Sequence, residues 1–471
     1  MSTSATGLGT LSLQLTKARF VSRQGESLLY LASILAYAIC SALALTVAGG
    51  TWMFYNRWQH PFGLIAEVLA VDPSYENYMT FYFVLAVIAC GLLVPSVIGL
   101  ASSAAVLGAR GRERRLAALR LLGVSSGDVT RMSLVDTLIQ AGIGAVIGTG
   151  LYYATLPLWS NISMQGEPLG AHEMWLPWWL LLSVLLGTIL IGVFASWWGL
   201  RQVRISPLGV ARRSSIPGLK VWRLVAFGVA IAAAAVVGRM LATAQAALPM
   251  MIMAVVILLA VWGLNLLGPW VLQTLSRLFA KAPSPSIVWA ARRIEANPKA
   301  TWQRVSGLGL LAFIGGFVAL LPMEIRDSEA GSAVTDFVTA ARWDFTTGAM
   351  ITLGIGMVLS AASILITQAS AVFERAEQSR ALTKMGAPSG YLSRVSWLET
   401  LGPLVLALAM AAALGAAMAD PLRMIGGTDT STGLLILAGV LGAGFVLAVG
   451  ALAAAEPLQR QVLGVQRRRN D

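Results

Sequence analysis

Long apolar runs alternate with short polar segments along almost the whole chain. A helix needs about 20 apolar residues to cross a bilayer, and about ten of the runs are long enough. Residues 1–24 are polar and precede the first run, which we therefore interpret as an uncleaved span. We expect the ten spans at approximately 26–50, 80–106, 132–156, 175–198, 222–242, 248–273, 305–323, 346–371, 395–419 and 432–454.

The composition excludes a soluble protein. Of the 471 residues, 57% are hydrophobic and 12% are charged, whereas soluble domains carry about 25% charged residues. The pattern therefore predicts an all-α integral membrane protein with about ten transmembrane helices.

Basic residues fall on alternate loops of the ten-span arrangement. The loops between these basic loops hold mainly acidic residues, and Arg57 is one of the few basic residues among them. This asymmetry is typical of the positive-inside rule and predicts cytoplasmic N- and C-termini in a multi-pass protein of the bacterial plasma membrane. The net charge of +12 is thus a sign of orientation, and we expect no nucleic-acid partner. The basic groups are 17–23, 110–131, 201–223, 277–304, 375–394 and 460–469.

Two cytoplasmic loops resemble each other. Residues 119–127 read LRLLGVSSG and residues 382–390 read LTKMGAPSG, and both continue into matching Arg, Ser, acidic and Thr positions. Pro-Leu follows both the fourth and the tenth span. We therefore predict two four-helix repeats joined by two linking helices. The expected units are a cytoplasmic or interfacial segment 1–25, a first four-span domain 26–213, two linking spans 214–284, a second four-span domain 285–460 and a basic tail 461–471.

Residues 110–131 combine an amphipathic helix, a break and a new span. Arginines alternate with leucines at helical spacing, Gly123 offers a helix stop, and Ser125, Ser126 and Asp128 can cap the next helix. Residues 374–394 repeat this plan and reach their break at Gly386. A cytoplasmic helix attached rigidly to a span can carry force from a docked partner into the membrane.

These motifs resemble the FtsX-like (MacB/LolC-type) permease domain of ABC transporters. The resemblance rests on Arg112-Glu113, on Leu-Leu-Gly-Val-Ser at 121–125, on the acidic Asp136 in the next span and on Ser-Pro-Leu at 206–208. It covers both four-span halves, and the first half matches better. The whole chain is similar to the ten-span bacitracin-exporter permeases, but the loop 324–345 is too short for the large extracellular domain of those proteins.

The resemblance implies that segments 112–128 and 377–392 are coupling helices that seat in clefts of a separate ABC ATPase, in two copies per permease chain. ATP and Mg would be bound by that partner, with no cofactor on this chain. Alternatively, the basic residues only anchor the loops to the phosphate headgroups of membrane lipids. The candidate coupling residues are Arg112, Glu113, Arg115, Leu119, Leu122, Gly123, Glu377, Arg380, Leu382, Met385 and Gly386.

No catalytic centre is evident in the sequence. It contains no Gly-x-x-x-x-Gly-Lys-Ser/Thr phosphate loop, and His172-Glu173 is too little for a metal site. We interpret Asp136 and Glu399, at the cytoplasmic ends of two spans, as a structural acidic pair that caps helices or pairs with the nearby Arg131 and Arg394. A functional role of these two acidic residues at membrane depth is the alternative.

The sequence therefore predicts the permease subunit of an ABC transporter that exports a hydrophobic or amphipathic compound, such as a lipid, lipopeptide or antibiotic. The alternative is an FtsX-type relay that transmits ATPase movement to an extracellular partner, for which the acidic segment 324–344 is the candidate surface. A polytopic enzyme is a third and weaker possibility.

Overall fold

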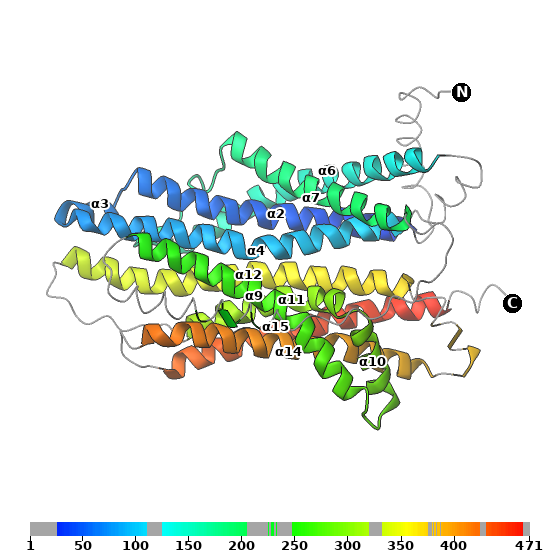
Figure 1. The fold of residues 1–471 in the computed structure, drawn as a ribbon. Coiled ribbons are helices and arrows are strands. Elements are labelled where there is room, and N and C mark those ends of the chain that lie inside the picture. Colours follow the sequence, from blue (N-terminus) through cyan, green and yellow to red (C-terminus); the bar gives the residue numbers. More distant parts are fainter. Residues whose placement is uncertain are drawn as a thin grey trace.

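A computed structural model gives the fold as a long bundle of helices, most of which run along one common direction (Figure 1). The structure describes residues 26–110, 125–204, 247–319, 332–374, 389–423 and 430–464, with eleven single positions near 225–232 and 379–388. The long helices are α2 (Glu26–Gln59), α4 (Glu76–Arg110), α6 (Ser126–Trp159), α7 (Trp178–Arg204), α9 (Ala247–Phe279), α11 (Pro298–Ala319), α12 (Ser332–Glu374), α14 (Ser389–Arg423) and α15 (Thr430–Gly464).

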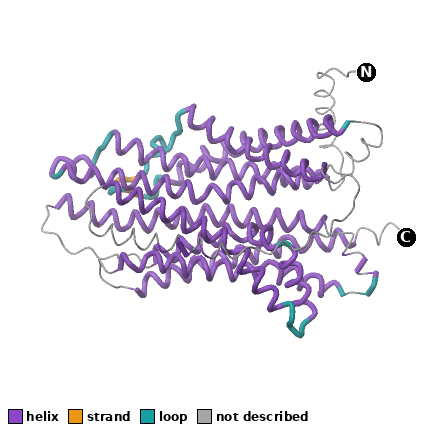
Figure 2. The backbone as a smooth tube through the Cα atoms, in the orientation of Figure 1, coloured by secondary structure: helices purple, strands orange, loops and turns teal. Residues whose placement is uncertain are grey.

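Helices dominate the described part of the chain (Figure 2). Short elements complete it: α3 (Leu64–Val71), the 3₁₀ turn η1 (Pro73–Tyr75), α10 (Pro285–Ala296), and a small hairpin of β1 (Ser163–Met164) and β2 (Glu167–Pro168). The expectation of an all-α membrane protein is confirmed. Six described helices are long and apolar enough to cross a membrane. Their apolar segments are Tyr30–Gln59, Glu76–Ala105, Thr130–Trp159, Trp178–Trp197, Val334–Ala369 and Gly390–Ala419.

Nine of the ten expected spans coincide with described helices, whereas the fifth, 222–242, lies largely outside the described residues. The eighth was expected to begin near residue 346, yet α12 begins at Ser332. Val334, Phe337 and Ala341, spaced three and four residues apart, are buried in a cluster with Ile65 and Val68 of α3 and with part of α4. This contact extends the helix beyond the apolar run, so the predicted boundary was wrong.

The helices of the two halves pair in the same way. In the first half, α2 packs against α4 and α6, and α7 packs against the same two helices. In the second half, α11 packs against α12 and α14, and α15 packs against the same two. The halves meet chiefly where α4 contacts α12, which we call the central seam, while α9 lies against α4, α10 and α11.

Small residues bring two helix pairs into close contact. Gly144 and Gly148 of α6 face α2, where a Cβ at Gly148 would lie 2.6 Å from the Ala38 carbonyl oxygen. On the other side, Gly316 of α11 and Gly415 of α14 face the backbone of the opposite helix, with Cβ positions that would overlap carbonyl oxygens. Because only glycine allows this approach, α2 with α6 and α11 with α14 form two tightly joined pairs.

Candidate functional site

The predicted coupling segments are partly described. Only Leu382, Met385 and Gly386 among the eleven candidate residues belong to the described part. The others lie outside it: Arg112, Glu113, Arg115, Leu119, Leu122, Gly123, Glu377 and Arg380.

The second coupling segment ends in a sharp break before α14. The Met385 N–H donates to the Ala381 carbonyl oxygen at 3.1 Å, which closes a helical turn. Gly386 follows with a φ of +92°, a left-handed conformation in which glycine carries no steric penalty. The helix stop predicted at Gly386 is thus confirmed. Leu382 is half-buried, while Met385 is 75% exposed and presents an apolar side chain at the surface.

The first coupling segment leads into α6 through a capped N-terminus. The Ser125 hydroxyl oxygen accepts a 3.1 Å hydrogen bond from the Asp128 N–H and donates a 2.6 Å bond to the Asp128 carboxylate. This cap satisfies one of the free N–H groups of the first turn. The capping predicted from Ser125 and Asp128 is confirmed.

Glu399 joins α14 to two neighbouring elements. Its buried carboxylate accepts hydrogen bonds from Arg293 of α10 at 3.4 Å and from Arg304 of α11 at 3.5 Å. The sequence suggested a partner one turn away, Arg394, but these two arginines come from other helices. Asp136 is also buried, near the start of α6. Both acidic residues are thus buried, and the ion pairs of Glu399 connect α14 to α10 and α11.

Further polar contacts fix the start of α14. Gln368 of α12 donates to the Thr400 hydroxyl at 2.6 Å, and the Tyr391 hydroxyl donates to the Pro285 carbonyl oxygen at 3.1 Å. The Tyr391 ring also packs against the Trp289 ring of α10, with 5.9 Å between the ring centroids. These contacts join α14 to α10 and α12 next to the predicted second coupling segment.

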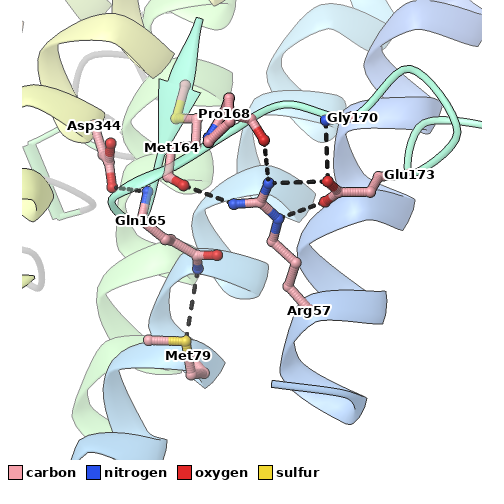
Figure 3. A network of polar contacts seen from close by, with 8 residues as sticks. All are labelled: Arg57, Met79, Met164, Gln165, Pro168, Gly170, Glu173 and Asp344. Carbon is pink, nitrogen blue, oxygen red and sulfur yellow. Dashed lines mark hydrogen bonds and ion pairs between the residues drawn. The ribbon is translucent and has the colours of Figure 1, made fainter. Parts of the chain in front are cut away.

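The opposite end of the bundle holds a buried arginine, Arg57 at the end of α2 (Figure 3). Its side chain is 1% exposed, and its Nε lies 2.6 Å from the Glu173 carboxylate. Nη1 donates to the Met164 carbonyl oxygen at 2.6 Å and Nη2 to that of Pro168 at 3.2 Å. The Gly170 N–H donates to the same carboxylate at 3.0 Å. Paired charges with these additional hydrogen bonds can be buried without an unmet polar group.

The β1–β2 hairpin, whose carbonyl oxygens accept hydrogen bonds from Arg57, also contacts the second half of the chain. Gln165 (φ +60°) and Gly166 (φ +80°) form its two-residue turn. Both adopt positive φ, as the tight turns of two-residue hairpins require. The Gln165 N–H donates to the Asp344 carboxylate of α12 at 2.7 Å, and the Gln165 side-chain amide contacts the Met79 sulfur at 3.6 Å (Figure 3).

Asp344 is the meeting point of three segments. Its Oδ2 accepts hydrogen bonds from the Gln165 N–H and from the Tyr82 hydroxyl of α4, each at 2.7 Å. The side chain is buried, although the sequence had placed it in an exposed acidic segment. We call this network the outer clamp, and it consists of Arg57, Tyr82, Gln165, Glu173 and Asp344.

Sequence reasoning missed the outer clamp. It treated Arg57, Glu173 and Asp344 only as charges of the outer loops. One signal was present: Arg57 is an isolated basic residue in a loop region that is otherwise acidic. Among the described residues, no three His, Cys, Asp or Glu side chains come together as a metal site would require, and Cys40 and Cys90 are free thiols.

Comparison with known families gives a match within the first half of the chain. Residues 86–208 match the family model described as FtsX-like permease C-terminal. The match runs from within α4 through α6 and α7 and includes the first coupling segment. No curated protein matches the chain. FtsX-like permeases are membrane components of ABC transporters, work with ABC ATPase partners and usually reside in the bacterial plasma membrane. With this domain and its apolar helices, the chain is a multi-pass membrane protein that carries an FtsX-like permease domain.

Proposed function

We propose that this permease exports a hydrophobic or amphipathic compound, driven by two copies of a separate ABC ATPase that bind its two coupling segments. ATP and Mg would be held by that partner alone. The observation that carries the proposal is the repeated helix pairing on the two sides of the central seam, with the family match in one of the two halves. Two equivalent bundles that meet at one seam can separate and close as units.

The two coupling segments support two ATPase sites. One precedes the capped start of α6, and the other precedes α14 beyond the break at Gly386. Each of these helices is tightly packed against a partner, α2 or α11, through glycines. Force applied at either segment therefore moves a helix pair and not a single helix.

The outer clamp supports a state that is closed on the outside. Arg57 and Glu173 both belong to the first half, so their ion pair can move with that half as one body. Asp344 belongs to α12, and its bonds to Tyr82 and Gln165 cross between the halves. Outward opening would break the bonds of Asp344 and leave the Arg57–Glu173 pair intact.

The central seam supports an amphipathic cargo. Leu93, Ile355 and Leu359 line its buried apolar part. Ser96 of α4 and Ser360 of α12 are also buried, and their hydroxyls have no hydrogen-bond partner in the described part of the chain. If the halves part, a mostly apolar seam with a few hydroxyls would suit a molecule with a long apolar part and a small polar group, such as a lipid, lipopeptide or antibiotic.

A relay to an extracellular partner is less well supported. In the described part of the segment proposed for that contact, Val334, Phe337 and Asp344 are buried inside the molecule. Asp336 and Trp343 remain exposed there. Binding of an extracellular protein that is lost with Asp336→Lys and Trp343→Ala would favour the relay over export.

Capture of the ATPase tests the coupling segments. The detergent-solubilised permease would be co-expressed with its ATPase and compared with a double charge reversal, Glu113→Lys with Glu377→Lys. The control is Glu67→Lys with Glu76→Lys, two exposed acidic residues on the opposite side of the membrane. We expect about two ATPases per permease with wild type and control, and loss of both in the reversal. Retention of the ATPase by the reversal would contradict this assignment of the coupling segments.

Export itself needs a transport assay. The complex would be reconstituted in proteoliposomes with fluorescent phospholipids, lipopeptides and apolar antibiotics. ATP-dependent movement of one class, absent without ATPase, would support export. ATP hydrolysis without movement of any of them, combined with capture of an extracellular protein, would favour the relay.

A further inference from the structure

The corner between α9 and α10 lies at the end of the bundle opposite α3 and the outer clamp (Figure 1). A helix of 33 residues such as α9 is about 50 Å long, whereas the hydrocarbon core of a bilayer is about 30 Å thick. The last turns of α9 therefore reach the headgroup layer, on the side that the charge pattern assigns to the cytoplasm.

A buried carboxylate holds two arginines at this corner. Glu295 is 7% exposed, and its two oxygens accept from Arg277 Nε at 3.4 Å and from Arg292 Nη1 at 3.0 Å. The arginine side chains themselves are 55% and 66% exposed. Each guanidinium has five N–H donors, so most of these donors remain outside the pair. Two cations share one anion, which leaves a net positive charge at the surface.

Exposed apolar side chains lie between basic ones in the chain at the end of α9. Leu278 is 63% exposed and Phe279 is 56% exposed. Lys281 is also exposed and lies in the turn that directly follows the last residue of α9, Phe279. The surface thus combines a place for apolar chains with a place for negative charge.

We propose that Arg277, Lys281 and Arg292 bind the phosphate of an anionic phospholipid, with its acyl chains against Leu278 and Phe279. Glu295 orients the two guanidiniums, so little side-chain freedom is lost on binding. A free phosphate would use the three cations but not the exposed apolar pair, which favours a lipid. The inference does not depend on the proposed export.

The proposed lipid site lies partly on α10, a helix that packs against the second half of the chain. α10 buries Ala290, Ala291 and Ile294 against the bundle, and its Trp289 contacts Tyr391 at the start of α14. The lipid site is therefore connected through one short helix to the second coupling segment.

Lipid retention measured by native mass spectrometry tests the site. The purified chain would be incubated with equal amounts of phosphatidylglycerol and phosphatidylcholine. We expect wild type to retain phosphatidylglycerol preferentially and Lys281→Gln to retain about fivefold less. The control Arg131→Gln removes an exposed arginine at the start of α6 and should match wild type.

A triple variant removes the two arginines and Glu295 without leaving a buried charge unpaired. Arg277→Gln, Arg292→Gln and Glu295→Gln together eliminate both arginines and the carboxylate that they neutralise. We expect it to retain much less phosphatidylglycerol than wild type does, while eluting as a monodisperse protein. Wild-type retention by both Lys281→Gln and this variant would overturn the proposal. Complete displacement of the lipid by millimolar inorganic phosphate would also overturn it, since it would show a plain anion site.

Discussion

Tyr82 of α4 and Asp344 of α12 are joined by a hydrogen bond of 2.7 Å, although 262 residues separate them in the chain. The same carboxylate oxygen accepts from the Gln165 N–H, also at 2.7 Å. Two donors of the first half thus meet one acceptor of the second half. The outer ends of the two halves cannot separate without losing both bonds.

Removal of this acceptor should weaken the contact between the halves. Asp344→Ala leaves the Tyr82 hydroxyl and the Gln165 N–H buried without their acceptor, at a cost of about 1–3 kcal/mol for each unmet group. We expect a lower midpoint of thermal unfolding in detergent, measured by intrinsic tryptophan fluorescence. The control is Asp336→Ala, at an exposed position on the same helix, which should have the same thermal midpoint as wild type. Equal midpoints for both variants would show that Asp344 does not hold the halves together.

The Arg57–Glu173 pair should be strongly coupled. Either Arg57→Ala or Glu173→Ala leaves one buried charge without its partner, and we expect a loss of about 3–5 kcal/mol of stability. The double variant should lose less than the sum of the two, because no unpaired charge remains. The exposed neighbour His172→Ala serves as control. Additive losses, measured by denaturant unfolding, would argue against the pair.

A reversible cross-link across the outer clamp should stop the transport cycle. Gln165→Cys and Asp344→Cys would be combined in a chain with Cys40→Ala and Cys90→Ala, which removes both native thiols. Oxidation should abolish cargo-stimulated ATP hydrolysis by the complex, and reduction should restore it. Each single-cysteine chain is a control for the substitution itself. Full stimulated hydrolysis in the cross-linked form would mean that the halves need not part at Asp344.

Backbone contact between α11 and α14 should make Gly415 intolerant of any side chain. In Gly415→Ala the new methyl group would overlap the Phe313 carbonyl oxygen, and such overpacking costs about 1–3 kcal/mol or more. The matched control on the same helix is Gly402→Ala, where no atom lies within 4 Å of the added carbon. Size-exclusion profiles and thermal midpoints compare the two. A normal midpoint for Gly415→Ala would contradict tight packing of this pair.

Local features of the fold were predictable from the sequence. Apolar runs indicated the helices, Gly386 indicated a helix stop, and Ser125 indicated an N-cap, because each depends on residues that are close in the chain. The start of α12 was not predictable in this way. It depends on burial of Val334 and Phe337 against α3, which lies more than 250 residues earlier.

The tertiary polar contacts were beyond sequence reasoning for the same reason. Glu399 was expected to find Arg394 near it on one helix, yet it pairs with Arg293 and Arg304, which approach from α10 and α11. In the outer clamp, Gln165 and Asp344 are 179 residues apart. Hydropathy and helical spacing carry no information on which distant helices become neighbours.

The Arg57 guanidinium donates its hydrogen bonds to residues within 164–173. These partners are synthesised long after Arg57 itself. Glu173 emerges from the ribosome 116 residues after Arg57, which takes about 6 to 23 s at ordinary rates of translation. During that interval the guanidinium lacks these partners, and we expect it to stay hydrated. Burial of Arg57 is then a late event in maturation, and a nascent chain stalled before residue 164 should still expose it to reagents added from outside the cell.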